Sequence, residues 1–182
     1  MSAAVVLVNP KTPYNVGAVI RACSIYEVTV LRWTGKRIST AEARRKSGTS
    51  LKRNRPRLPR EERLRDYANV DWREAPDDVV STLVAPYNLT PVCVEIIPGT
   101  ESLATFEHPA RPLYVFGPED GNVPAGVRTI CHRFVRIPTL NRTPLNLAAA
   151  VNIVLYDRLA KEIRGDSQDP ENQEGELYAS HR

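Results

Sequence analysis

The stretch that indicates the fold most directly is Leu113-Tyr114-Val115-Phe116-Gly117-Pro118-Glu119-Asp120-Gly121. Its first four residues are apolar and predict a strand, and the glycine and proline that follow predict a sharp turn. In open α/β sheets, ligands bind outside the carboxyl ends of the strands, so this turn is an expected site loop. The turn matches neither GxGxxG nor GxxxxGKS/T, which argues against a Rossmann dinucleotide site and against a P-loop.

On the N-terminal side of this stretch, strand and helix patterns alternate. Residues 3–8 form a continuous aliphatic run, which is typical of a strand buried on both faces. Apolar residues recur at helical spacing over residues 16–25, and Asn15 stands where an N-cap belongs. Residues 28–31 predict a second strand. The chain is therefore expected to open as strand, helix, strand.

The alternation extends toward the C-terminus. Residues 79–84 and 92–97 are apolar, and their pattern fits either strands or short helical segments. Residues 134–137 predict another strand. A long helix is expected from Thr143, which can cap it, with Pro144 in its first turn. The apolar stripe of this helix comprises Leu147, Val151, Val154, Leu155 and Leu159. Together these patterns predict an α/β fold, with a parallel sheet flanked by helices.

Three turns that follow predicted strands hold most of the polar residues that could carry chemistry. Each of them, taken alone, is explained equally well as a tight turn or a helix start. In the first turn, Asn15 and Arg21 are six residues apart, nearly two helical turns, so they are not neighbours on the helix itself. The residues of interest are Asn15, Gly17 and Arg21 in the first turn, Gly117 to Gly121 in the second, and Ile137, Pro138 and Thr143 to Leu147 in the third.

Taken together, the three turns resemble the signature motifs of the SpoU/TrmH branch of the SPOUT RNA methyltransferases, over roughly residues 3–163. The family pattern Asn-x-Gly-x-x-x-Arg is met by Asn15, Gly17 and Arg21. The phrase hydrophobic-Phe-Gly-Pro-Glu-x-x-Gly is nearly met by residues 115–121. The Ile-Pro and Ser-Leu-Asn elements correspond to Ile137-Pro138 and Pro144-Leu145-Asn146. Pro144 stands where the family usually has serine, so a hydroxyl is missing there, and Thr143 is the nearest replacement.

The resemblance implies a fold and a cofactor. Family members have a C-terminal trefoil knot, one of the few true knots in proteins, and bind S-adenosylmethionine in a bent shape, chiefly through main-chain groups. The matching positions here are Gly117, Ile137, Pro138 and Leu145. The family forms a homodimer through its first and last helices, so that each active site borrows from both subunits. The chain is expected to lack the extra N-terminal RNA-binding domain of many relatives and to resemble the minimal members that methylate tRNA.

The resemblance also implies a reaction, the methylation of a ribose 2′-hydroxyl in RNA. Arg21 matches the residue that the family places nearest the hydroxyl. Because arginine stays protonated in proteins, it is a poor base. We therefore expect Arg21 to stabilise the alkoxide or hold the adjacent phosphate, with the proton acceptor unassigned. Asn15, Glu119 and Asn146 are expected to orient Arg21 and shape the pocket.

A basic stretch from Arg32 to Arg65 holds thirteen lysine and arginine residues and three acidic residues. Such a one-sided segment suggests a polyanionic partner, although a solvated loop is the alternative. We expect an RNA-binding insertion at about residues 32–65, with short helical pieces near 40–46 and 60–67, within a methyltransferase domain over residues 1–164. The leading phosphate contacts are Arg44, Arg45, Arg53, Arg55 and Arg57. The acidic tail, residues 165–182, is expected to be disordered.

Several classes of protein are disfavoured. No apolar run approaches the roughly 20 residues that cross a bilayer, and the first residues do not resemble a signal peptide, so a cytoplasmic protein is expected. The three cysteines and three histidines are scattered, which suggests neither disulfides nor a metal site. Cys131-His132 is more easily read as a buried thiol beside a histidine than as a nucleophile and base. Trp33, Tyr67 and Trp72 are core aromatics or, less readily, platforms for RNA bases.

Three other functions remain as alternatives. The first is an RNA-binding protein that has kept the fold and lost activity, which the missing serine at Pro144 motivates. The second is a methyltransferase that acts on an RNA base, since the fold serves both chemistries. The third is a small-molecule enzyme that uses the turn at Gly117, but this leaves the basic stretch unexplained. Transfer RNA is the favoured substrate, and ribosomal RNA is open.

Overall fold

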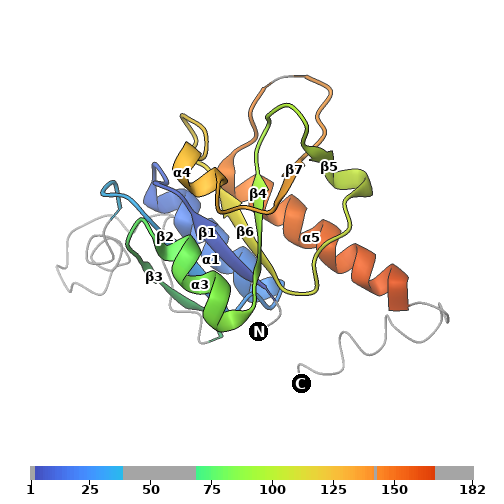
Figure 1. Cartoon of the computed structure of the whole chain (residues 1–182), viewed down its shortest axis with the longest axis horizontal. Helices are drawn as coiled ribbons and strands as arrows, with labels where there is room; N and C mark the ends of the chain where they lie inside the picture. The colour runs from blue at the N-terminus through green and yellow to red at the C-terminus, as the bar shows by residue number, and fades with distance from the viewer. Residues whose placement is uncertain (1–2, 39–68, 142, 167–182) are drawn as a thin grey trace, which may run out of the picture.

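The computed structural model describes residues 3–38, 69–141 and 143–166, and these contain one seven-stranded sheet (Figure 1). The strand order is β3-β2-β1-β6-β4-β7-β5, and every neighbouring pair is parallel. The predicted α/β fold with a parallel sheet is thereby confirmed. The strands are β1 (Ala4–Leu7), β2 (Val30–Trp33), β3 (Asp71–Glu74), β4 (Thr90–Val94), β5 (Glu101–Ser102), β6 (Pro112–Phe116) and β7 (Arg133–Arg136).

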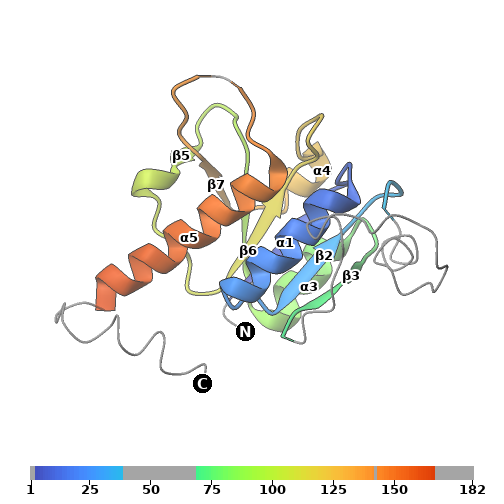
Figure 2. The same cartoon turned by 180° about the vertical axis from the view of Figure 1, so that it is seen from behind.

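Helices cover both faces of this sheet (Figures 1 and 2). Helices α3 (Val79–Tyr87) and α4 (Ala125–Arg128) lie on one face, and α1 (Pro13–Ile25) and α5 (Leu147–Asp166) lie on the other; a short 3₁₀ helix, η2, spans Leu103–Thr105. Strand β1 is buried on both faces, as its aliphatic run predicts, with alternate residues in two separate apolar clusters. Val5 packs on the side of α1 and α5, and Val6 on the side of α3.

Helix α1 begins three residues earlier than predicted, and its N-cap is Thr12, so the prediction of Asn15 as the cap is wrong. The Thr12 side chain accepts a hydrogen bond from the backbone N–H of Asn15, at 3.4 Å. Pro13 occupies the first turn, where its missing N–H costs nothing. Asn15 is therefore inside the helix and buried, and its side-chain amide is left for other partners.

Helix α5 begins later than predicted, at Leu147, and not at Thr143. The side-chain oxygen of Asn146 accepts hydrogen bonds from the backbone N–H groups of Ala148 and Ala149, at 2.9 and 3.2 Å. Asn146 is thus the capping residue. The predicted apolar stripe faces the core, since Leu147, Val151, Val154 and Leu155 are buried.

Strand β3 was not expected, and it changes the interpretation of Arg32. Arg32 lies in β2 with 5% of its surface exposed, and its guanidinium donates to the Asp71 carboxylate at 2.5 Å. Arg32 therefore belongs to the sheet and does not contribute its charge to an exposed basic surface. Trp33 and Trp72 stack with ring centroids 6.0 Å apart and are buried, so both belong to the core.

The remaining predictions concern shorter segments. Residues 79–84 prove to be helical, within α3, whereas the 92–97 stretch begins in β4. Strand β5, η2 and α4 were not expected. Cys131 is buried, as preferred from the sequence, and Cys23 and Cys93 are buried too. Tyr67, the expected helical pieces near 40–46 and 60–67, and the five arginines proposed to bind RNA all lie outside the described residues.

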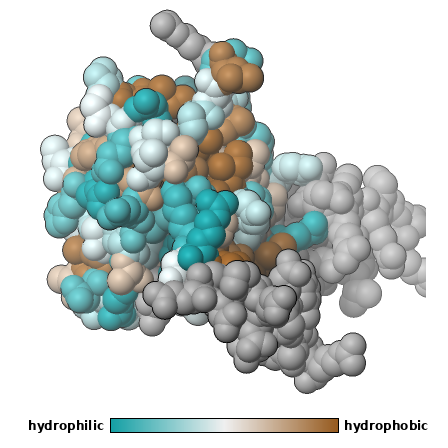
Figure 3. Space-filling view, turned by 90° about the vertical axis from the view of Figure 1, so that its right-hand side faces the viewer, coloured by the Kyte–Doolittle hydropathy of each residue, from teal (hydrophilic) through white to brown (hydrophobic). Residues whose placement is uncertain are grey.

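The surface at the end of the molecule that carries η2 and the last turns of α5 mixes hydrophobic and hydrophilic residues (Figure 3). Within the described ranges, no helix is long and apolar enough to span a membrane.

Candidate active site

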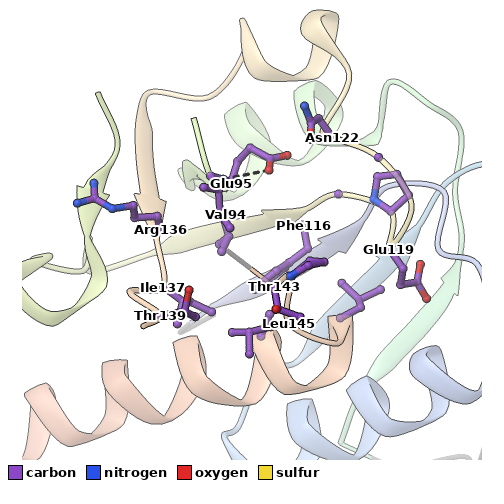
Figure 4. Close-up of a pocket in the computed structure, with 17 residues that line it drawn as sticks. Val94, Glu95, Phe116, Glu119, Asn122, Arg136, Ile137, Thr139, Thr143 and Leu145 are labelled. Atoms are coloured by element: carbon purple, nitrogen blue, oxygen red, sulfur yellow. Dashed lines mark hydrogen bonds between the residues drawn. The ribbon is translucent and has the colours of Figure 1, made fainter. Parts of the chain in front are cut away.

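A cavity of about 230 Å³ opens at the carboxyl ends of three strands (Figure 4). Strands β4, β6 and β7 contribute the residues that follow them, and the segment before α5 closes the remaining side. This is the position that the strand-end rule predicts for a ligand in an open α/β sheet. The walls combine apolar side chains such as Phe116 and Leu147 with polar ones such as Glu95, Asn122 and Thr139.

The turn after β6 folds back closely on Gly117. A Cβ atom at this position would lie 3.0 Å from the backbone nitrogen of Val123 and 3.3 Å from the carbonyl carbon of Asn122, so a side chain would push the turn open. The Glu95 carboxylate, at the end of β4, accepts a hydrogen bond from the Val123 N–H at 2.8 Å. The glycine and the carboxylate thus hold the same wall of the cavity.

Residues from all three predicted turns meet beside this cavity. The Asn15 amide donates a short hydrogen bond to the Glu119 carboxylate, and the Asn146 amide donates to the Asn15 side-chain oxygen at 3.0 Å. The second carboxylate oxygen of Glu119 accepts from the backbone N–H of Lys11 at 2.8 Å. The structure therefore brings together three of the four residues expected to be catalytic. Their roles in a reaction stay predictions.

Arg21, the fourth, lies on the same helix as Asn15 but faces another direction. Six residues along an α-helix correspond to a rise of about 9 Å and a rotation of about 120° relative to the starting residue. Arg21 is half-buried and shares its helix face with Tyr14, Ala18 and Ile25. Tyr14 and Ile25 are 44% and 63% exposed, whereas Ala18 packs against the core, so this face is partly uncovered.

Comparison with known proteins places these features in a family. Residues 2–156 match the family model described as the SpoU rRNA Methylase family. The chain belongs to the SpoU rRNA methylase family. No curated protein matches the chain. The resemblance that the three motifs suggested is thereby confirmed.

Solved structures of SpoU-type enzymes have the same fold. The SpoU methyltransferase AviRb from Streptomyces viridochromogenes superposes with a TM-score of 0.67 at 20% identity, covering 90% of this chain and 60% of that one. The A. aeolicus TrmH/SpoU tRNA modifying enzyme superposes with a TM-score of 0.67 at 18% identity, and the match covers 90% of this chain and 77% of that one. A protein described through the 2-OH methylation of C/U34 on tRNA superposes with a TM-score of 0.65 at 23% identity. That match covers 90% of this chain and 97% of the other. The first listed match, an rRNA methyltransferase from Sinorhizobium meliloti, is spanned over only 56% of its length.

Three of the four positions predicted to bind the cofactor of SpoU enzymes line the cavity, namely Gly117, Ile137 and Leu145. Pro138 does not line it and is exposed between two residues that do, Ile137 and Thr139. Successive residues of an extended segment point to opposite sides, which accounts for this difference. Pro144, at the position of the family serine, and its neighbour Thr143 also lie on the cavity wall.

The loop after β6 is also tied to the start of the basic stretch. Arg37 contacts Asp120 at 2.8 Å, and the Lys11 ammonium lies 4.0 Å from the same carboxylate. The Arg37 guanidinium holds the pKa of Asp120 below its usual value, and Asp120 in turn raises the pKa of Arg37. The chain thus enters the predicted RNA-binding stretch directly beside the cavity loop.

Sequence reasoning missed the contribution of β4. Val94, Glu95 and Ile96 line the cavity at the end of this strand, and Arg136 lines it at the end of β7. The apolar pattern of residues 92–97 fits a strand and a helix equally well, so the sequence alone does not place Glu95 at a strand end. The strand-end rule would have found it once β4 was assigned.

A second polar cluster lies on the α5 side of β6, away from the cavity lining. The ring of His108 contacts the Tyr114 hydroxyl at 2.6 Å through Nδ1 and the Asp157 carboxylate at 2.8 Å through Nε2. The Lys161 ammonium donates to Asp157 at 2.7 Å and to the backbone oxygen of Phe106 at 3.0 Å. Burial lowers the pKa of His108, and the Asp157 carboxylate opposes this. Burial raises the pKa of Tyr114.

Proposed function

We propose that the protein transfers a methyl group from S-adenosylmethionine to a ribose 2′-hydroxyl of RNA, most simply of tRNA. The observation that carries the proposal is the convergence of Asn15, Glu119 and Asn146 beside the cavity. These residues come from the three motifs of a family of RNA methylases, to which the chain belongs. The likeness to a protein of similar length described through 2-OH methylation on tRNA supports the choice of substrate.

The cavity residues fit the proposed cofactor. Apolar walls suit an adenine ring, and the glycine at position 117 lets the turn that forms one wall of the cavity fold closely over the backbone. Main-chain groups at Gly117, Ile137 and Leu145 are the ones that would hold it. When bound, S-adenosylmethionine supplies an electrophilic methyl group on a positively charged sulfur. The protein's own residues must then place the hydroxyl in line with it.

Arg21 is proposed to stabilise the ribose alkoxide or to hold the neighbouring phosphate. A guanidinium suits either task, because it keeps its charge and offers several donors in a plane. Hydrogen bonds link the side chains of Asn15, Glu119 and Asn146. This link would fix the start of α1 and the start of α5 relative to the cavity. Since these groups lie on another face of α1 than Arg21, they would orient it through the helix and not through direct contact.

We further propose that the protein is a homodimer through α1 and α5, which pack side by side (Figure 2). On α5, Ile153 and Tyr156 are 37% and 62% exposed, and on α1 the exposed apolar residues Tyr14 and Ile25 flank Arg21 along its helix face. A second copy of the chain would cover these side chains. Arg21 of one copy would then lie near the active site of the other copy. Sedimentation at micromolar concentration is expected to give twice the mass of one chain.

The basic stretch is proposed as the surface that binds RNA phosphates, with Arg44, Arg45, Arg53, Arg55 and Arg57 as leading contacts. Binding through phosphates releases counterions and therefore weakens as salt increases. RNA affinity measured between 50 and 200 mM salt is expected to fall by about tenfold or more, on the basis of a few phosphate contacts. An affinity that does not change with salt would exclude this stretch as the docking surface.

The function is tested by incubating the purified protein with S-adenosylmethionine labelled in its methyl group and with total RNA. The expected product is labelled tRNA that resists alkaline cleavage at one linkage, because a 2′-O-methyl group blocks that cleavage. Label on a base, with the linkage still cleaved, would favour the base-directed alternative. Binding of RNA without any transfer of label, in a preparation that does not bind the cofactor, would favour the inactive alternative.

A further inference from the structure

Neither the predicted motifs nor the proposed mechanism uses the carboxylate of Glu95. Glu95 follows β4 and lines the cavity (Figure 4). One oxygen accepts from the backbone N–H of Ile96 at 3.0 Å, and the other accepts from the Val123 N–H at 2.8 Å. Two backbone donors fix the side chain in place. An ionised carboxylate has about four acceptor sites, so it can still interact with a ligand.

The other charged residues among the described part of the cavity lining are directed to partners elsewhere. The Glu119 carboxylate already belongs to the proposed mechanism, through its hydrogen bonds with Asn15 and with the backbone of Lys11. The Arg136 guanidinium donates to the backbone oxygen of Thr100, and its side chain points away from the cavity in Figure 4. Among the charged residues that line the cavity in the described part of the chain, Glu95 is therefore the acidic one to which the proposed mechanism gives no role.

We propose that Glu95 is a specificity-determining residue, whose carboxylate favours the positively charged methyl donor over its neutral thioether product. The inference rests on the proposed function, because it takes S-adenosylmethionine as the ligand. The sulfonium carries one positive charge that S-adenosylhomocysteine lacks, while the rest of the two molecules is the same. A fixed negative charge on the cavity wall, partly shielded from water, therefore increases the affinity for the charged donor more than the affinity for the neutral product.

The same side chain also holds the cavity wall. Its hydrogen bond to Val123 keeps the turn folded over Gly117, where an added Cβ would meet the same nitrogen. The two contributions can be separated by substitution. Glu95→Gln removes the charge and keeps an oxygen that can accept from Val123. Glu95→Ala removes both the charge and the hydrogen bond.

The test is calorimetric titration of the full chain with S-adenosylmethionine and with S-adenosylhomocysteine. The variants are Glu95→Gln and Glu95→Ala, and the matched control is Glu107→Gln, which removes one charge from an exposed position outside the cavity lining. Thermal unfolding checks that each variant is folded. Wild-type protein is measured first, and failure to bind either ligand would overturn both the proposed function and this inference.

In Glu95→Gln, the affinity for S-adenosylmethionine is expected to fall about threefold to tenfold, from a Coulombic interaction at a high effective dielectric constant. The affinity for S-adenosylhomocysteine should change less than twofold, and Glu107→Gln should leave the ratio of the two affinities unchanged. Glu95→Ala should weaken both ligands. If wild-type protein binds both ligands and Glu95→Gln leaves their ratio unchanged, the inference is wrong and the proposed function stands. A Glu95→Ala variant that binds the product normally would overturn the role in holding the wall.

Discussion

Two clusters of polar side chains join distant parts of this chain, and they differ in what lies beside them. Asn15, Glu119 and Asn146 meet at the carboxyl ends of the strands, next to a cavity. Tyr114, His108 and Asp157 meet on the α5 side of β6, where the Tyr114 ring is fully buried.

The second cluster looks more like catalytic machinery than the first, since it contains a hydroxyl, a histidine and a carboxylate in hydrogen-bonded sequence. Yet none of its members lines the cavity. A nucleophile and a base act only on a substrate within their reach. The hydroxyl of Tyr114 is buried, so a substrate could not reach it. We therefore interpret the second cluster as a structural hydrogen-bond network that holds α5 against the loop before β6. The difference teaches that the neighbouring cavity, more than the chemistry of the side chains, distinguishes a site from a structural network.

The largest expected effect separates reaction from binding. Arg21→Ala should lower the rate of methyl transfer by about 100-fold or more, as expected when a group that stabilises developing charge is removed. Affinity for S-adenosylmethionine, measured by calorimetry, should stay within about twofold, because Arg21 is not among the residues that line the cavity. Arg73→Ala, on the exposed edge strand, serves as the control. Near-normal turnover in Arg21→Ala would contradict the proposed role.

Gly117→Ala tests the cavity wall. The added methyl group would lie 3.0 Å from the Val123 nitrogen and should displace the turn that Glu95 holds. We expect affinity for S-adenosylmethionine to fall by about tenfold, which corresponds to the loss of one hydrogen bond to a charged group. Gly126→Ala is a matched control, since a Cβ there meets no atom within 4 Å. Equal affinities in the two variants would show that the close approach at Gly117 is unimportant for binding.

Tyr114→Phe tests the second cluster and should change stability, not activity. Loss of the hydroxyl leaves the buried Nδ1 of His108 without its partner, so the free energy of unfolding should decrease by about 1–2 kcal/mol. Chemical denaturation measures this, with Tyr87→Phe, at an exposed position on α3, as the control. The transfer rate should be unchanged at temperatures where the variant is folded. A large loss of activity in a stable Tyr114→Phe protein would make the second cluster a functional one.

The pH dependence of stability gives the smallest expected effect. Because burial lowers the pKa of His108, the folded protein binds a proton there less readily than the unfolded chain does. The free energy of unfolding should therefore be highest above about pH 6.5, the ordinary value for histidine, and should decrease as the pH falls below it. His108→Gln should flatten this dependence between pH 5 and 7, and His132→Gln, at an exposed site, should not. Parallel curves for the wild type and His108→Gln would refute the assignment.

The sequence was sufficient for the parallel sheet and for the meeting of three motifs, but it placed two helix starts wrongly. Thr12 and Asn15 are both good capping residues, as are Thr143 and Asn146, and local chemistry does not choose between them. The choice follows from tertiary contacts. Asn15 lies within α1, where its side chain donates to Glu119. Asn146 both caps α5 and donates to Asn15.

Arg32 and β3 show a second limit. Asp71–Glu74 is short, and three of its four residues are exposed, so it carries little of the pattern of a buried strand. Without β3 there is no partner for Arg32, and its charge looks like part of the basic stretch. Only the pairing of β2 with β3 places Asp71 beside it.

The double role of Asn146 bears on which changes of chain length this fold can accept. The segment from Thr139 to Leu145 is followed by Asn146, which is fixed twice, by the backbone of α5 and by Asn15. Extra residues within that segment would enlarge a loop and leave both attachments in place. One extra residue directly after Asn146 would instead rotate α5 by about 100° relative to its own cap, and would turn its apolar stripe out of the core. Natural or engineered insertions are therefore expected before this asparagine and not behind it.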